Sequence, residues 1–438
     1  MLICISMINF SELWKWEIYA LRGFDITATD NSATFKSPTF ERRLPSGDLL
    51  GPDPGGGVGP SRDGDLRRTP EEEESRRLRL LSADETRTCG GGGAADLARA
   101  KPLRRNSLTG DVGNNDQFTV GNPFLYELFT FGTELGNEMF FIVFFPFVFW
   151  NVDALVSRRL IIVWAWNLFV GQSTKDLVRW SRPASPPVVK VEVFYNSEYS
   201  MPSTHAMTGT AIPFSLFMLS YGRWEYSFSL GLSVALGWSV LVCLSRVYMG
   251  MHSVLEVITG FLYSLLILAV LQPMLGAIDG FYATHPLAPL TIVVSHVGMG
   301  LVAFSLDSWS TSRGDTAQAL ATGVGAALGT HVNSRLGLLT DPLAASLPLA
   351  VPAVGLGLLG RSLARFVLGV AVLLVSRMVM KAVTIPALCR VFGMPSGDVR
   401  QARQHMRVEL PYRYIVYSVV GFCCVCVVPW VFGVFGLA

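Results

Sequence analysis

The run LGWSVLVCLSRVYMGMHSVLEVITGFLYSLLILAVL, residues 236 to 271, consists of two apolar stretches joined by a short segment that carries Arg246, His252 and Glu256. Each apolar stretch belongs to a segment long enough to cross a hydrocarbon layer of about 30 Å as a helix. Similar apolar stretches, each ended by charged or turn residues, recur from about residue 137 to the C-terminus. The sequence therefore predicts an all-α, polytopic membrane protein.

Composition supports a membrane protein and excludes nucleic acid as a partner. Of the 438 residues, 50% are hydrophobic and only 16% are charged, a share well below that of an ordinary soluble domain. The net charge is only +2, and the basic residues are scattered. We expect about eight to ten membrane helices, near residues 137–154, 160–176, 205–221, 226–244, 253–275, 288–306, 316–334, 342–360, 363–384 and 411–436. The shorter segment 124–136 is expected to be an interfacial helix, a re-entrant piece or an extra crossing.

The N-terminal region differs in composition from the rest. It contains GPDPGGGVGP at 51 to 60, EEEE at 71 to 74 and GGGG at 90 to 93. Such a segment cannot bury enough apolar surface to offset its ordering entropy. We therefore expect a disordered tail over 1–118 and a membrane domain over 119–438, with its core at about 137–276. Within the tail, LRRNSLTG places Ser107 two residues after an Arg pair, which a basophilic kinase could recognise.

Three short motifs stand where predicted helices stop. They are KDLVRWSRP at 175 to 183, PSTH at 202 to 205 and SRVYMGMHSVLE at 245 to 256. The second predicted helix ends at the first motif, the third begins at the second motif, and the fourth returns to the last one. Counting crossings in this way places all three motifs on one face of the membrane.

The residue types in these motifs suit a phosphate group. Arg182 and Arg246 carry planar guanidinium groups that can bind a phosphate through two hydrogen bonds, and Lys175 supplies a point charge. Ser203, with backbone amides at the start of a helix, adds neutral donors at the positive end of the helix dipole. We expect no metal and no cofactor, because the acidic residues nearby are dispersed in the sequence: Asp176, Glu192 and Glu198.

Two histidines complete a possible phosphatase site. Glu256 follows His252 by four residues, so its carboxylate can orient the imidazole and stabilise its charged form. His252 could then attack phosphorus, and His205 could protonate the leaving alkoxide and afterwards activate water. Each feature alone also has a structural explanation: helix-end anchors for Lys175 and Arg182, a helix N-cap for Ser203, a structural pair for His252 and Glu256. The conjunction of three motifs at one depth favours catalysis.

These motifs resemble those of the type 2 phosphatidic acid phosphatase superfamily, whose pattern is K-x6-RP, PSGH and SR-x5-H-x3-D. Thr204 stands where most of the superfamily has glycine, and Glu256 stands where it has Asp. PSTHA and the residues VFYNSEYSM directly before it are similar to the sphingosine-1-phosphate phosphatase branch. The more distant stretches FGTELGNE and DSWSTSRGDTA are similar to the same branch, and RRNSLTG favours the type 1 form within it. The resemblance covers about residues 119–438.

The resemblance implies a metal-independent enzyme of the endoplasmic reticulum membrane that removes phosphate from sphingoid-base phosphates through a phosphohistidine. It implies that His252, His205 and Glu256 are catalytic and that Lys175, Arg182, Ser203, Thr204 and Arg246 hold the phosphate. It also implies a site facing the lumen. Arg158 and Arg159, between the first two predicted helices, and the basic stretch 381–407 favour the cytosol, opposite the motifs.

Two other functions fit the same residues. A phosphotransferase would pass the phosphoryl unit to another lipid alcohol instead of water, and a transporter or scaffold would bind lipid phosphate without turnover. Basic motifs at helix ends, rather than broken helices at the membrane midplane, argue against transport. The remaining histidines and the loop residues near the motifs are expected to be structural or exposed: His285, His296, His331, His405, Tyr195, Asn196, Tyr199, Asp307, Arg313 and Asp315. No sequence feature indicates an oligomeric state.

Overall fold

The computed structural model describes residues 122–437, apart from 184–187, 189–190, 192–197, 307–312, 340, 343 and 394–405. The predicted tail, Ser107 and His405 lie outside the described residues, as do Glu192, Tyr195, Asn196 and Asp307. Helices make up the regular secondary structure of the described part, in which two isolated β-bridges join Tyr221 to Trp224 and Trp224 to Leu349. The all-α prediction is confirmed.

The described chain opens with a bent pair of helices, α3 (Pro123–Glu134) and α4 (Glu138–Asn151), at 64° to each other. Asn122 and Asn137 cap the two N-termini through their side-chain oxygens. The segment 124–136, for which the sequence left three interpretations open, is thus a separate short helix followed by a sharp bend.

The next four helices carry the three motifs. They are α5 (Ala154–Val178), α6 (Thr204–Ser220), α7 (Phe228–Tyr248) and α8 (Val254–Thr284). Each begins after a residue whose side-chain oxygen accepts a backbone N–H of the first turn, which fixes where the helix starts. These capping residues are Asp153, Ser203, Ser227 and Ser253. Two of the motifs therefore contain the capping serines of α6 and α8.

The C-terminal half adds α9 (Ala288–Leu306), α10 (Arg313–Arg335), α11 (Leu356–Val391), α13 (Met406–Phe422) and α14 (Val428–Val434). A five-residue π-helix, η2 (Cys423–Val427), joins α13 to α14. The prediction of a helix at 342–360 is wrong, because the described residues from there to Gly355 form only the 3₁₀ turn η1 (Ala344–Ser346) and irregular chain. Its prolines remove backbone donors and disfavour a helix; they are Pro342, Pro348 and Pro352.

Among the residues that the structure describes, six helices are long and apolar enough to cross a membrane by length and composition, or seven if the bent pair counts as one span. That number is lower than the eight to ten we expected, because α11 replaces two predicted helices. In addition, α6 has only 17 residues, and the 23 residues of α10 are mainly small and polar. The chain is a multi-pass membrane protein.

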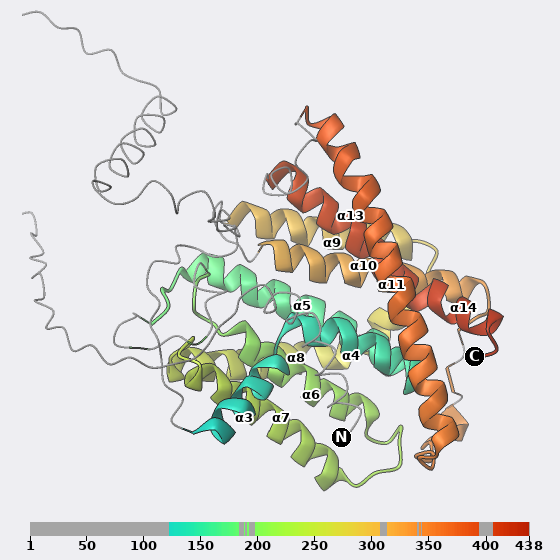
Figure 1. The fold of residues 1–438 in the computed structure, drawn as a ribbon, viewed down its shortest axis with the longest axis horizontal. Helices are drawn as coiled ribbons and strands as arrows, with labels where there is room; N and C mark the ends of the chain where they lie inside the picture. The colour runs from blue at the N-terminus through green and yellow to red at the C-terminus, as the bar shows by residue number, and fades with distance from the viewer. Residues whose placement is uncertain are drawn as a thin grey trace, which may run out of the picture. The chain divides into compact units, whose positions relative to one another are not determined.

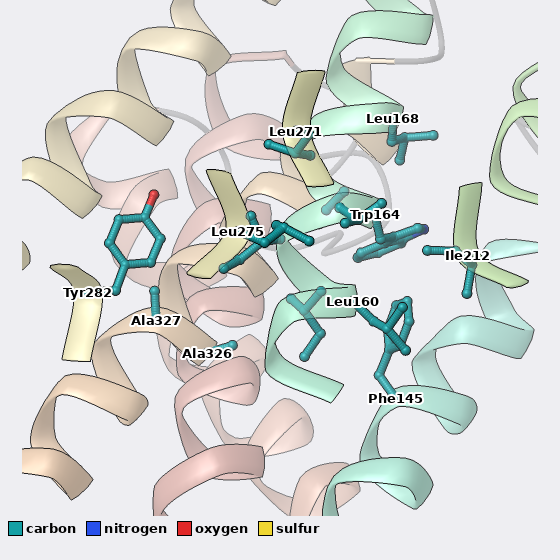
Figure 2. Packing of buried hydrophobic residues seen from close by; sticks show 14 of the residues in the cluster. Phe145, Leu160, Trp164, Leu168, Ile212, Leu271, Leu275, Tyr282, Ala326 and Ala327 are labelled. Atoms are coloured by element: carbon teal, nitrogen blue, oxygen red, sulfur yellow. The ribbon is translucent and has the colours of Figure 1, made fainter. Parts of the chain in front are cut away.

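Helix α5 lies at the centre of the packing and positions the first motif. Figure 1 shows it between the helices α3, α6, α7 and α8 on one side and α9, α10 and α13 on the other. Figure 2 shows Leu160 and Trp164 of α5 among side chains of α4, α6, α8 and α10. The Trp164 ring meets Phe145 edge-on, with ring centroids 5.6 Å apart. Such close packing holds the far end of α5 in register with its neighbours.

Arg158 and Arg159 do not lie in a loop between helices, as the sequence suggested, but inside the first turns of α5. Arg158 is buried, and its guanidinium donates to Asp279 at 2.7 Å and to Asp341 at 2.9 Å. Arg159 also donates to Asp279, at 3.1 Å. These arginines therefore join α5 to α8 and to the chain before η1.

Candidate active site

The end of α5 meets the start of α6. Lys175 lies in the last turn of α5, with only 1% of its surface exposed, and its Nζ donates to Thr204 Oγ1 at 3.0 Å. Arg179 ends α5 in a left-handed conformation with φ +53°, which turns the chain toward Arg182. The first and second motifs are thus in direct contact.

The third motif forms a tight connection between α7 and α8. Gly250 has φ +67°, a backbone conformation that favours glycine. The backbone N–H groups of Met251 and His252 then both donate to Arg246 O, at 3.2 and 3.3 Å. This turn places His252 one residue before the Ser253 cap of α8.

His252 and Glu256 form a buried pair. His252 Nδ1 lies 3.0 Å from Glu256 Oε2, and both side chains are almost fully buried. Glu256 is also the third residue of α8 and forms a capping box with Ser253, in which its Oε2 accepts the Ser253 N–H at 3.1 Å while Ser253 Oγ accepts the Glu256 N–H at 3.4 Å. The longer glutamate therefore reaches the imidazole, as an orienting carboxylate must.

Arg182 determines which tautomer His252 adopts. Its Nη1 lies 3.3 Å from His252 Nε2 and donates to Met251 O at 3.1 Å. A guanidinium can only donate, so Nε2 must accept, and the ring proton must sit on Nδ1, facing Glu256. In this arrangement Nε2 keeps the lone pair that a nucleophile needs.

Glu198 belongs to the site, although sequence reasoning counted it among dispersed acidic residues. Its carboxylate is buried, with Oε2 3.4 Å from Lys175 Nζ and 3.8 Å from Arg182 Nη2. Its backbone carbonyl accepts from Arg182 Nε at 3.1 Å. Because these are two of the cations expected to hold phosphate, the carboxylate lies where it would compete with a bound anion.

A second residue that the sequence did not single out is Ser200. It is fully buried, its Oγ hydrogen-bonds to Glu256 Oε2, and the same Oγ lies 3.2 Å from His252 Nδ1. Its only sequence signal was its position three residues before Ser203.

The start of α6 packs directly on α8. Ser203 Oγ accepts the Ala206 N–H at 3.4 Å, and the Ser203 N–H donates to Glu256 O at 3.3 Å. A Cβ at Gly260 would lie 2.7 Å from Ser203 O, so glycine is needed there for the close approach. The Ser203 side chain thus acts as a helix cap in this structure, and its backbone anchors the second motif to the third.

His205 and Arg246 complete the group of charged and titratable residues. Arg246 is fully buried in the last turn of α7, with Nη1 3.5 Å from Thr133 Oγ1, and His205 is half-buried in the first turn of α6. Burial lowers the pKa of His252 well below its ordinary value of 6.5, and the positive charges of Arg182 and Arg246 lower it further. Lys175 and His205 act in the same direction. His252 is therefore neutral at neutral pH.

The structure brings all eight residues of the predicted site to one end of the helix bundle, with three buried cations and two histidines. Such a cluster can hold an anion in a partly dry environment, where fixed donors are most effective. Within the described ranges, no group of three or more His, Cys, Asp or Glu side chains could hold a metal ion.

The three other histidines in the described part of the chain lie elsewhere. His296 Nδ1 contacts Ile292 O at 2.8 Å, and His331 Nδ1 contacts Tyr282 O at 3.0 Å. His285 is exposed beyond the far end of α8. Asp315, in the first turn of α10, lies 3.6 Å from Arg413 Nη1.

The end of α11, with Arg390 in its last turn, lies at the same end of the bundle as the motifs, not opposite them. Ile385 of α11 packs in one cluster with Val408 at the start of α13. Arg413 of α13 pairs with Asp315 at the start of α10, and the preceding helix α9 ends where Leu306 O accepts from Arg179, at 3.2 Å. The prediction that the basic stretch 381–407 lies opposite the motifs is therefore wrong for its described residues up to Gly393, because α11 crosses once where two crossings were predicted.

Comparisons with known proteins agree with the motifs. The profile of the PAP2 superfamily matches residues 140–277. Sphingosine-1-phosphate phosphatase 1 of Rattus norvegicus is 54% identical over 340 residues, which cover 78% of this chain and 79% of that protein. Sphingosine-1-phosphate phosphatase 2 of Homo sapiens is 38% identical over 323 residues, or 73% and 80% of the two chains.

A dihydrosphingosine 1-phosphate phosphatase of Schizosaccharomyces pombe is 32% identical over 145 residues, which cover 32% of this chain and 35% of that protein. No solved structure matches the chain. With relatives this similar over most of their length, and with the three motifs assembled at one end of α5 to α8, the chain belongs to the sphingosine-1-phosphate phosphatase family of the PAP2 superfamily.

Proposed function

We propose that this protein hydrolyses sphingosine-1-phosphate and related sphingoid-base phosphates to the free base and inorganic phosphate, without metal or other cofactor. The observation that carries the proposal is the position of His252, whose Nδ1 lies 3.0 Å from Glu256 and whose Nε2 lies 3.3 Å from Arg182. An oriented, neutral imidazole beside buried cations suits nucleophilic attack on a phosphate.

In the first step, His252 Nε2 attacks phosphorus and the bond from phosphorus to the lipid oxygen breaks. His205, which must be protonated at the start of this step, gives its proton to the leaving alkoxide, which becomes the hydroxyl of the sphingoid base. Glu256 holds the Nδ1 proton and stabilises the charge that the imidazole gains. The product of this step is a phosphohistidine at His252.

In the second step, His205 takes a proton from water as the water oxygen attacks phosphorus. The phosphorus–nitrogen bond breaks, phosphate leaves, and His252 regains its lone pair. Lys175, Arg182 and Arg246 hold the peripheral oxygens throughout, with Thr204 and the Ser203 region at the start of α6 as neutral donors. Arg182 must turn from Nε2 toward the phosphate when substrate binds.

The test is phosphate release from sphingosine-1-phosphate by detergent-solubilised protein with EDTA present. We expect turnover by the wild type, and loss of turnover in His252→Ala and His205→Ala. His285→Ala is the matched control, because His285 is exposed at the opposite end of α8. Full turnover by His252→Ala would show that the nucleophile is wrong, and transfer of phosphate to an added lipid alcohol instead of water would indicate a phosphotransferase.

We further propose that the protein resides in the endoplasmic reticulum membrane with its site facing the lumen, supported by the family to which it belongs. Glycosylation acceptor sites inserted in loops test the orientation, since only lumenal asparagines are glycosylated. An acceptor inserted after Gly393, at the motif end, should be modified, and one inserted after Gly337, at the far end of α10, should not. The reverse pattern would place the site in the cytosol.

A further inference from the structure

One buried hydroxyl touches both members of the catalytic pair. Ser200 Oγ hydrogen-bonds to Glu256 Oε2 and lies 3.2 Å from His252 Nδ1, while Nδ1 and Oε2 are 3.0 Å apart. The three atoms form a closed triangle. Ser200 is itself fixed, because its N–H donates to Trp180 O at 2.8 Å and its side chain is fully buried.

The directions of the hydrogen bonds in the triangle follow from the chemistry of its members. A carboxylate only accepts, so the Ser200 hydroxyl donates to Glu256. Arg182 donates to His252 Nε2, so the ring proton sits on Nδ1 and points at Oε2 and Oγ. The serine oxygen can therefore accept part of the Nδ1–H while its own proton holds the carboxylate.

The longer side chain at position 256 needs additional contacts to hold its carboxylate in place, and the Ser200 hydroxyl provides one of them. Glutamate has one more rotatable bond than aspartate, and ordering an additional bond costs conformational entropy. Two donors meet Glu256 Oε2 besides the imidazole, namely the Ser253 N–H at 3.1 Å and the Ser200 hydroxyl. The backbone donor holds the carboxylate at α8, and the serine holds it from the side of the second motif.

We propose that Ser200 is a positioning residue of the proposed phosphatase reaction: it fixes Glu256 and the His252 imidazole relative to each other, so that Nε2 faces the phosphate. The inference rests on the proposed function. It does not make Ser200 a ligand of substrate.

The test compares kinetics of Ser200→Ala with wild type on sphingosine-1-phosphate in detergent. Loss of one buried hydrogen bond to a charged group should lower kcat by about ten- to a hundredfold and leave KM within about twofold. The acid limb of the kcat profile should move to higher pH, because a carboxylate with one donor fewer stabilises the protonated imidazole more strongly. Arg182, Arg246, Lys175 and His205, which also act on His252, are unchanged in the variant.

Ser239→Ala is the matched control, because Ser239 is equally buried and its Oγ lies 2.7 Å from Thr210 Oγ1, between α6 and α7. It should keep kcat and the pH profile of wild type. If Ser200→Ala does not fold, Ser200→Cys keeps the side-chain volume but is a weak donor, and it should show the same loss.

A double-mutant cycle with Glu256→Ala distinguishes a positioning role of Ser200 from a general effect on the structure. If Ser200 acts through the carboxylate, Ser200→Ala should cost little further kcat in the Glu256→Ala protein. The proposal would be overturned if Ser200→Ala or Ser200→Cys kept the kcat and the acid limb of wild type. It would also be overturned if Ser200→Ala lowered kcat by the same factor with and without Glu256. Failure of the proposed function would look different, as absence of turnover by wild type or full turnover by His252→Ala.

Discussion

Replacing Glu256 by Asp, the residue that the motif pattern SR-x5-H-x3-D has at this position, should impair this protein. The change removes one carbon–carbon bond, about 1.5 Å long, from the side chain. In the structure Glu256 Oε2 lies 3.0 Å from His252 Nδ1 and 3.1 Å from the Ser253 N–H. Withdrawing the carboxylate toward α8 would lengthen its distance to the imidazole to about 4 Å, beyond hydrogen-bond range.

The magnitude follows from the hydrogen bond between the Glu256 carboxylate and the His252 imidazole. A hydrogen bond to a charged group contributes about 1.5–3 kcal/mol, and each 1.4 kcal/mol corresponds to about a tenfold change in rate. We therefore expect kcat to fall by about ten- to a hundredfold in Glu256→Asp. KM should change little, because the carboxylate does not contact the phosphate in the proposed reaction.

The assay is steady-state release of phosphate from sphingosine-1-phosphate, with thermal unfolding in detergent measured in parallel. Glu225→Asp makes the same truncation on an exposed side chain in the α6–α7 connection and should behave as wild type. Turnover by Glu256→Asp equal to or above that of wild type would refute the reasoning, since it would show that the length of this side chain does not set the position of the imidazole.

Three further outcomes follow from the geometry. Gly260→Ala should lower activity or the free energy of unfolding, the latter by about 1–3 kcal/mol if the helices cannot separate, because its Cβ would lie 2.7 Å from Ser203 O. Gly276→Ala, with open space around it, is the control, and equal behaviour of the two variants would contradict the close approach. The acid limb of kcat/KM should lie below pH 6.5, because burial and nearby positive charges disfavour protonated His252; a limb above pH 6.5 would contradict a neutral nucleophile. Glu198→Gln should strengthen inhibition by inorganic phosphate by roughly tenfold, because a carboxylate no longer competes for the two cations that lie 3.4 and 3.8 Å from it. Weaker inhibition would show instead that the carboxylate helps to bind phosphate.

The residues of the candidate site could be predicted from sequence because they lie at the ends of the apolar helices. Charged and histidine side chains at the ends of apolar helices can only gather at a membrane face, and counting crossings brought Lys175, His205 and His252 to the same one. The helix starts were equally predictable, since Ser203 and Ser253 cap α6 and α8.

The loop residues could not be predicted in the same way. Ser200 and Glu198 reach the site through the path of the chain between α5 and α6, which has no helical period to reveal it. Glu198 even counted as a dispersed acid, although it lies 3.4 Å from Lys175 Nζ.

The errors in helix count and orientation have one origin. Pro348 and Pro352 interrupt an apolar run for which hydropathy alone predicts a helix, while α11 continues for 36 residues beyond them. Because one crossing too many was predicted, the end of α11 was assigned to the wrong end of the helix bundle. The place of Arg158 was also predicted wrongly, because its partners Asp279 and Asp341 are more than a hundred residues away in sequence.

The central claim is that His252 carries the phosphoryl group during turnover. Rapid mixing with sphingosine-1-phosphate labelled in the phosphate, followed by an alkaline quench and peptide mapping, should find label on the peptide containing His252, in a linkage that is lost in acid. The label should be absent from His252→Ala and present in His285→Ala. Label on another residue, or turnover by wild type with no labelled protein at any time point, would contradict the account.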